Sequence, residues 1–159
     1  MIIKNNYGKS VSQIQTKKIV VAISGYFNPL HVGHLEMIKI SRKLGDHLVA
    51  IVNNDKQVKL KGSVPFMKQA DRMKIVGSLK DIDEVFLSID KDKSVCASLA
   101  KLKPDIFAKG GDRNVGNIPE VAVCQKYGIK IVDGLGKKIR SSSILIKDAS
   151  KKKKYAQKN

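Results

Sequence analysis

The chain is 159 residues long, 42% of its residues are hydrophobic, and its formal net charge is +17. This length suits one domain with a sizeable core, and no apolar run reaches the about 18 residues that a membrane span needs. Cys96 and Cys124 lack C-x-x-C spacing, and with only three histidines they exclude a structural zinc site, so we expect buried free thiols.

Lysine supplies most of the positive charge, and only Lys151–Lys154 form a dense run. A basic chain suits nucleic acid, an anionic membrane or a small polyanionic substrate. Because the other lysines are spread along the whole chain, they do not point to nucleic acid in particular. The first residues lack the apolar run of a signal peptide, so we expect a cytoplasmic protein.

Apolar runs alternate with stretches of helical period. Residues 1–16 are interpreted as an N-terminal extension, residues 17–149 as one domain, and residues 150–159 as a basic tail. We expect strands at residues 18–24, 47–52, 84–89, 105–109 and 129–132. We expect helices beginning near residue 31, at residues 65–79, 94–102 and 119–127, and from residue 141 onward. This order predicts an α/β fold with about five parallel strands and helices on both faces of the sheet.

An H-x-G-H tetrad, His31 to His34, lies where the first strand should hand over to a helix. Two imidazoles one turn apart at a helix start can face one small anion. The free N–H groups and the dipole of that helix start favour the same anion. Histidines that only cap the helix are the alternative, but the ten-residue context from Gly25 favours a phosphate site.

Three further stretches suit a nucleotide site. Ser141–Ser143 follow the last strand, and their hydroxyls either cap a helix or donate to a phosphate. The stretch Lys109–Asp112 ends a strand in two glycines, which either make room for a ligand or form a plain turn. The lysines of residues 53–62 are either solvated or hold a phosphate as mobile charges in a flexible loop.

Residues 18–147 resemble the cytidylyltransferase-like nucleotidyltransferases. The motif G-x-F-[DN]-x-x-H-x-G-H is met at residues 25–34, and residues 139–147 are similar to I-S-[ST]-[ST]-x-[IL]-x-x-[RK]. Residues 104–112 look like the P-D-x-x-x-K-G-G-D segment of ADP-heptose synthase adenylyltransferase domains, and residues 53–62 resemble the lysine-bearing loop of the family. The resemblance implies a Rossmann-like, doubly wound fold.

The resemblance also implies roles for individual residues. His31 and His34 would stabilise the charge that builds at the transferring phosphoryl group, with Lys59 as a third catalytic residue. Lys59 and Lys61 would bind the phosphate of the acceptor. The residues expected to bind the nucleotide are Gly25, Tyr26, Phe27, Asn28, Gly33, Arg72, Gly110, Gly111, Asp112, Arg140, Ser141, Ser142 and Ser143.

The implied reaction moves a nucleoside monophosphate from ATP or CTP to a sugar or polyol phosphate and releases pyrophosphate. Mg²⁺ would bridge the phosphates, no metal site built by the protein alone is expected, and related enzymes imply a homodimer. Asn28 stands where many sugar-phosphate members carry Asp. Same-fold adenylyltransferases acting on FMN, phosphopantetheine or nicotinamide mononucleotide therefore remain an alternative. A non-catalytic nucleic-acid-binding protein is the more remote one.

Overall fold

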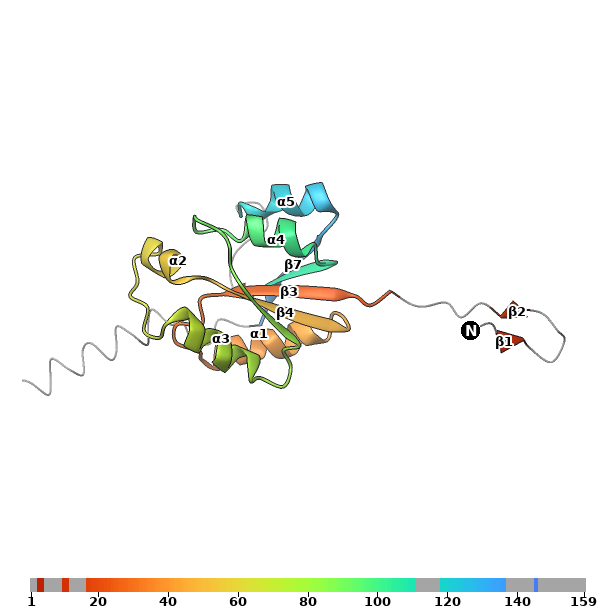
Figure 1. Ribbon diagram of the computed structural model, residues 1–159, viewed down its shortest axis with the longest axis horizontal. Coiled ribbons are helices and arrows are strands. Elements are labelled where there is room, and N and C mark those ends of the chain that lie inside the picture. Colours follow the sequence, from red (N-terminus) through yellow and green to blue (C-terminus); the bar gives the residue numbers. More distant parts are fainter. Residues whose placement is uncertain (1–2, 5–9, 12–16, 111–117, 137–144, 146–159) are drawn as a thin grey trace, which may run out of the picture.

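The computed structural model describes residues 3–4, 10–11, 17–110, 118–136 and 145 (Figure 1). Its centre is a five-stranded sheet of order β5-β4-β3-β6-β7, in which every neighbouring pair is parallel. The strands are β3 (Val20–Gly25), β4 (His47–Val52), β5 (Glu84–Leu87), β6 (Ile106–Gly110) and β7 (Lys130–Leu135). Two short strands, β1 (Ile3–Lys4) and β2 (Ser10–Val11), form a separate antiparallel pair.

Helices cover both faces of the sheet. Within the described residues they are α1 (Val32–Arg42), α2 (Asp55–Leu60), α3 (Gln69–Gly77), α4 (Cys96–Leu102) and α5 (Glu120–Tyr127). Figure 1 shows α1 and α3 on one face and α4 and α5 on the other, with α2 beyond the carboxyl ends of the strands. The predicted doubly wound α/β fold is therefore confirmed.

Two apolar cores explain why the central strands are apolar throughout. Successive side chains of a strand point to opposite faces. Val21 and Ile23 of β3 belong to the core that contains Ile38 of α1, whereas Ala22 belongs to the core that contains Leu99 of α4. A strand buried on both faces is typical of a parallel sheet between helical layers.

Aspartates fix the amino ends of the strands. Asp46 and Asp105, just before β4 and β6, accept hydrogen bonds from the backbone N–H groups of Ile19 and Val20, at 2.8 and 2.9 Å. Asp83, just before β5, accepts one from Leu48 N–H at 2.7 Å. Each carboxylate thus connects the start of its own strand to the start of a neighbouring strand. The candidate site lies at the opposite edge of the sheet, at the carboxyl ends of the strands.

Some element boundaries differ from the sequence prediction. The helix predicted over residues 65–79 begins at Gln69, and helix α2 replaces what was predicted to be a flexible loop. The helix predicted from residue 141 onward and most of the two terminal segments lie outside the described residues. No helix in the described part of the chain is long and apolar enough to cross a membrane.

Both cysteines are free, as predicted. Cys124 is buried against α4, and burial raises the pKa of its thiol to about 11. Cys96 is half-buried, and burial raises the pKa of its thiol as well. Since the thiolate is the reactive form, both residues are suited to packing rather than to chemistry.

Candidate functional site

The histidine tetrad lies at the carboxyl edge of the sheet, at the point where the chain leaves β3. The sheet order places β4 on one side of β3 and β6 on the other. The connections from β3 and β6 therefore run to helices on opposite faces, and a crevice opens where they separate. Open α/β sheets bind ligands at such a switch point.

Glycines end both strands at this crevice. A Cβ atom on Gly25 would lie 2.8 Å from the Phe27 ring, and one on Gly110 would lie 2.8 Å from the sulfur of Met37. Both distances are shorter than real Cβ contacts, so a larger residue would displace the Phe27 ring at position 25 and the flexible Met37 side chain at position 110. Whether Gly25 and Gly110 also contact a nucleotide stays a prediction.

The two histidines stack on each other at the start of α1. Their ring centres are 3.8 Å apart with an interplanar angle of 24°, and the ring of Phe27 lies 4.9 Å from that of His34. His31 is the N-cap residue of α1, and its carbonyl accepts from His34 N–H at 2.9 Å. Gly33 lies between the two histidines in the first turn. The tetrad is thus one compact unit, as its spacing predicted.

One ring nitrogen of His34 caps the helix, and this fixes the tautomer of the ring. His31 N–H donates to Nδ1 of His34 at 3.3 Å. Because Nδ1 accepts, the proton of a neutral ring is carried by Nε2. Capping and phosphate binding are therefore compatible, since each uses a different nitrogen.

Burial keeps His34 neutral. It lowers the pKa of His34 from 6.5 to about 3, with smaller contributions from His31 and from the positive charge of Lys61. Burial also lowers the pKa of His31. At neutral pH the pair therefore offers N–H donors to an anion rather than two positive charges.

Lys59 lies in helix α2, and Lys61 is the C-cap residue of that helix. The prediction of a flexible loop for this stretch was therefore wrong. The helix begins with a capping box, in which Gln57 N–H donates to Oδ1 of Asn54 and Asn54 N–H donates to Oε1 of Gln57, both at 3.0 Å. These bonds satisfy amide groups that a helix start otherwise leaves unpaired. The two lysines are thus carried by ordered backbone.

The lysines differ in their relation to the histidines. Lys59 is exposed on α2. Lys61 follows the helix as its C-cap, and its ammonium nitrogen lies 4.3 Å from the centre of the Tyr26 ring. Tyr26 is in the turn that leads to the tetrad, and the charge of Lys61 reaches His34. The structure therefore brings Lys61 and the histidines together.

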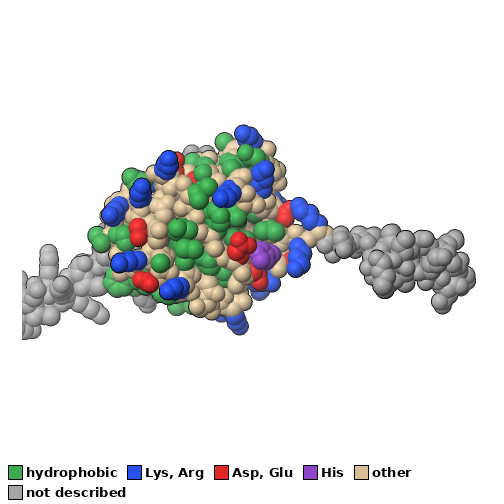
Figure 2. Space-filling view, viewed as in Figure 1, with side chains coloured by type: hydrophobic (Ala, Val, Ile, Leu, Met, Phe, Trp, Pro, Cys, Tyr) green, Lys and Arg blue, Asp and Glu red, His purple; other side chains and the backbone are tan. Residues whose placement is uncertain are grey.

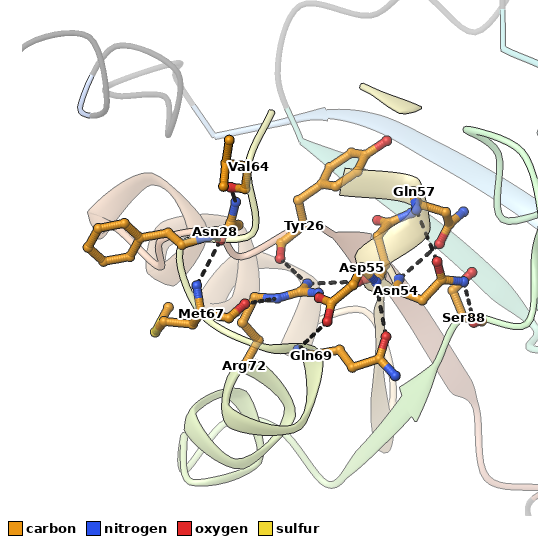
Figure 3. Close-up of polar contacts among 12 residues, drawn as sticks. Tyr26, Asn28, Asn54, Asp55, Gln57, Val64, Met67, Gln69, Arg72 and Ser88 are labelled. Carbon is orange, nitrogen blue, oxygen red and sulfur yellow. Dashed lines mark hydrogen bonds and ion pairs between the residues drawn. The ribbon is translucent and has the colours of Figure 1, made fainter. Parts of the chain in front are cut away.

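Arg72 supports the site from beneath. Its side chain is fully buried, with Nη1 donating to the carbonyl oxygens of Tyr26 and Asn53, both at 2.7 Å. Nε donates to the carbonyl oxygen of Met67 at 3.2 Å, and Nη2 pairs with Asp55 at 2.7 Å (Figure 3). These contacts engage the guanidinium within the protein, and the direct nucleotide contact expected of Arg72 stays a prediction.

Asp55 and Gln69, which the sequence analysis did not single out, join the starts of α2 and α3. Asp55 N–H donates to Oε1 of Gln69 at 3.0 Å, and Gln69 N–H donates to Oδ2 of Asp55 at 3.3 Å (Figure 3). The same carboxylate binds Arg72 through Oδ1. The sequence signal was weak, because two polar residues 14 apart predict no contact.

Asn28 holds the segment between α2 and α3. Its side-chain N–H donates to the carbonyl oxygen of Val64 at 2.8 Å, and its oxygen accepts from the N–H groups of Phe66 and Met67 at 2.7 and 3.3 Å. The Asn28 side chain is buried, as is that of Phe27 beneath Gly25. Both side chains therefore support the turn, and the nucleotide contacts expected of these two residues stay predictions.

A buried ion pair lies at the end of β6. Lys109 Nζ is 3.2 Å from Oε2 of Glu120, and the other oxygen of Glu120 accepts from Val95 N–H at 3.1 Å. This pair connects the K-G-G-D stretch to α4 and α5. The remaining predicted residues, Gly111, Asp112, Arg140 and Ser141–Ser143, lie outside the described residues.

The described part of the chain contains no group of three or more His, Cys, Asp or Glu side chains placed to hold a metal ion. Asp55, the first residue of α2, is engaged by Arg72 and Gln69.

The comparison with known proteins agrees with the geometry. The sequence profile of the cytidylyltransferase-like family matches residues 22–145. An FAD synthase of Ferroglobus placidus is 38% identical over 72% of this chain and 72% of its own length. Bifunctional protein HldE of Streptomyces coelicolor is 34% identical over 82% of this chain but only 28% of its own length.

Solved structures match as well. A lipopolysaccharide core biosynthesis protein of Thermoplasma volcanium superposes with a TM-score of 0.65 at 30% identity, over 76% of this chain and 98% of that one. A pantoate–β-alanine ligase of Francisella tularensis, at 15% identity and a TM-score of 0.52, shares the fold.

Proposed function

We propose a specific reaction for this chain, which belongs to the cytidylyltransferase-like family and is a nucleotidyltransferase. In that reaction the phosphate oxygen of a small phosphorylated acceptor attacks the α-phosphorus of a nucleoside triphosphate. A nucleoside monophosphate is transferred, and pyrophosphate leaves. ATP is the proposed donor, and CTP is the alternative.

The stacked histidine pair carries this proposal. A neutral His34, held through Nδ1, offers its Nε2–H without having to reorganise. Donors fixed in advance toward developing negative charge are the largest usual contribution to catalysis of this kind. The pair also lies at a helix start, whose free N–H groups favour a phosphate. No side-chain nucleophile is needed.

The proposed acceptor is a sugar or polyol phosphate. Its support is the K-G-G-D stretch and the likeness to HldE proteins, of which the chain spans only about a quarter. Lys61, beside Tyr26 and His34, is placed to bind the acceptor phosphate. Lys59 is the second candidate for this contact, and its exposure on α2 leaves its side chain free to move toward a ligand.

FMN is the second candidate acceptor. Its support is the group of FAD synthases of 31–41% identity, of which this chain spans 66–78% of the length. In this reaction the FMN phosphate attacks and FAD forms. The chemistry at the histidines is the same for both acceptors, so the choice depends on residues that bind the rest of the acceptor.

Mg²⁺ is proposed to enter with the nucleotide and to neutralise charge on the phosphates. No step above depends on it. The proposed nucleotide residues outside the described part of the chain, Gly111, Asp112, Arg140 and Ser141–Ser143, would complete the phosphate and nucleoside sites. A homodimer and a cytoplasmic location are proposed on the family resemblance.

Nucleic-acid binding is less well supported. Figure 2 shows basic side chains spread over the visible face with acidic side chains between them, rather than gathered in one stripe. A nucleic-acid footprint is a clustered basic surface. Removal of residues 150–159 distinguishes the two hypotheses. A nucleic-acid-binding protein would lose affinity for nucleic acid, whereas the enzyme would keep its turnover.

The test combines each of ATP and CTP with a panel of acceptors: heptose 1-phosphate, glycerol 3-phosphate, FMN, phosphopantetheine and nicotinamide mononucleotide. Products are identified by mass, and pyrophosphate is measured in parallel. We expect one acceptor class to give a nucleotidyl product with one pyrophosphate per product. No product with any pair would reject the proposed reaction.

A further inference from the structure

A single buried guanidinium joins segments that surround the site. The acceptors of Arg72 lie after β3 at Tyr26, after β4 at Asn53 and Asp55, and before α3 at Met67. Figure 3 shows Tyr26, Asp55 and Met67 around the guanidinium. All are at the carboxyl edge of the sheet, where the histidine turn and α2 meet.

We propose that Arg72 is a positioning residue that holds α2 against the histidine turn and thereby sets where the ammonium group of Lys61 lies. On this view Arg72 acts on catalysis through Lys61 and does not touch the nucleotide. The inference rests on the proposed function only in assigning Lys61 to a phosphate of the substrates. The geometric part stands on the contacts alone.

The connection from Arg72 to Lys61 is short. Asp55 is the first residue of α2, and Lys61 is its C-cap, so the guanidinium binds the beginning of the helix whose end carries the lysine. Arg72 also binds the carbonyl of Tyr26, whose ring lies under the Lys61 ammonium group at 4.3 Å. One guanidinium therefore fixes both sides of this cation–π contact.

Lysine cannot replace arginine in this position. The guanidinium reaches four acceptors because its donors are arranged in a rigid planar fork. A lysine ammonium is a compact point charge on a flexible stem. Arg72→Lys keeps the buried charge but releases some of the joined segments, which makes it the informative substitution.

The first measurement is independent of activity. The ring current of Tyr26 should shift the NMR signals of the Lys61 side-chain methylenes upfield, with assignment from the Lys61→Met variant. We expect Arg72→Lys to reduce this shift at a temperature where the remaining amide spectrum is native. An Arg72 with a purely structural role would leave the shift in place.

The second measurement is a double-mutant cycle on turnover with the acceptor found active. We expect Arg72→Lys to lower kcat/KM by about tenfold, and by no more than Lys61→Met does, because it acts by misplacing a substrate-binding group. In the Lys61→Met background the same change should cost no more than about twofold, within the range of additive error. The proposal would be overturned if the two substitutions lowered kcat/KM independently of each other in the double variant. Normal turnover of Arg72→Lys would overturn it as well.

Arg42→Lys is the matched control. Arg42 lies at the opposite edge of the sheet, where Nη1 donates to the carbonyl of Gly45 at 2.9 Å. This variant should change neither the Lys61 signals nor kcat/KM. If Arg72→Lys does not fold, Asp55→Asn tests the same link, because it removes the negative charge that pairs with Arg72 at the start of α2, and it should lower kcat/KM in the same direction.

The two hypotheses fail differently. A wild-type protein without turnover on any acceptor rejects the proposed function but leaves the NMR measurement decisive for Arg72. Turnover with additive effects in the cycle, or an unchanged Lys61 shift in Arg72→Lys, rejects the positioning role and leaves the proposed function intact.

Discussion

Replacing His34 with asparagine separates the structural and chemical roles of its ring. The Asn side-chain oxygen takes nearly the position of Nδ1 and can accept the hydrogen bond from His31 N–H, which is 3.3 Å long in the native structure. Nothing in the shorter side chain replaces Nε2. The change therefore keeps the helix cap and removes the group proposed to donate to the transferring phosphoryl.

The expected loss of kcat is about 10²–10³-fold, as for the removal of one fixed donor to developing charge. Stability gives a second signal. Because the pKa of folded His34 is about 3 and its ordinary value is 6.5, the unfolded chain binds a proton below pH 6.5 that the folded chain does not. This contribution to stability is complete above pH 6.5 and is lost as the pH falls toward about 3.

The size of the pH effect follows from linkage. Each pH unit below 6.5 lowers the free energy of unfolding by at most about 1.4 kcal/mol. After allowance for partial solvent screening, about 2 kcal/mol should be lost by pH 4.5. His34→Asn has no such group. Its free energy of unfolding should therefore fall less between pH 7 and pH 4.5 than that of the wild type.

The assays are pyrophosphate release and urea denaturation at the two pH values. His47→Asn is the matched control, because His47 lies at the other edge of the sheet, where it contacts Glu84 at 3.2 Å. The control should keep full turnover. Unchanged turnover in His34→Asn would refute the role of Nε2. The same pH dependence of stability in variant and wild type would refute the buried neutral ring.

Three further predictions concern the supporting residues. Lys61→Met should raise KM for the phosphorylated acceptor about tenfold or more through loss of a charged contact of about 1.5–3 kcal/mol, and a fall in kcat alone would contradict this. Asn28→Ala removes three hydrogen bonds and should lower the free energy of unfolding by about 2–3 kcal/mol; a loss below the error of urea denaturation would contradict it. Lys109→Met leaves the Glu120 carboxylate buried without its ion-pair partner and should lower the free energy of unfolding by about 3–5 kcal/mol. If the additional change Glu120→Gln does not restore most of this stability, the loss does not come from the ion pair.

The strands and the tetrad were predictable because their signals are local. The run at residues 47–52 is apolar and bounded by polar residues, and β4 has the predicted bounds. The H-x-G-H spacing places both histidines in the first helical turn. In each case a single segment contains the whole pattern, and the fold only has to bury it.

Helix α2 was missed although a local signal existed. Asn54 and Gln57 have the spacing of a capping box, which marks a helix start. The lysines that follow were interpreted as solvated loop residues, because the helix is too short to show a clear apolar period. Short helices depend on caps and tertiary contacts, so composition describes them poorly.

The supporting contacts could not be predicted. Arginine is rarely fully buried, and the burial of Arg72 depends on carbonyl groups from three separate segments. Asn28 binds Val64, 36 residues further along the chain. Motif comparison assigned both residues to the nucleotide site, but it carries no information on the contacts that each side chain makes within the protein.

The most direct test of the central claim uses ATP or CTP that carries a radiolabel on either the α- or the γ-phosphorus, with the acceptor panel. Nucleotidyl transfer predicts that the α-label appears in the covalent product formed with the acceptor. The γ-label should appear in pyrophosphate. Transfer of the γ-label to the acceptor, or its release as inorganic phosphate with no α-labelled product, would contradict the account.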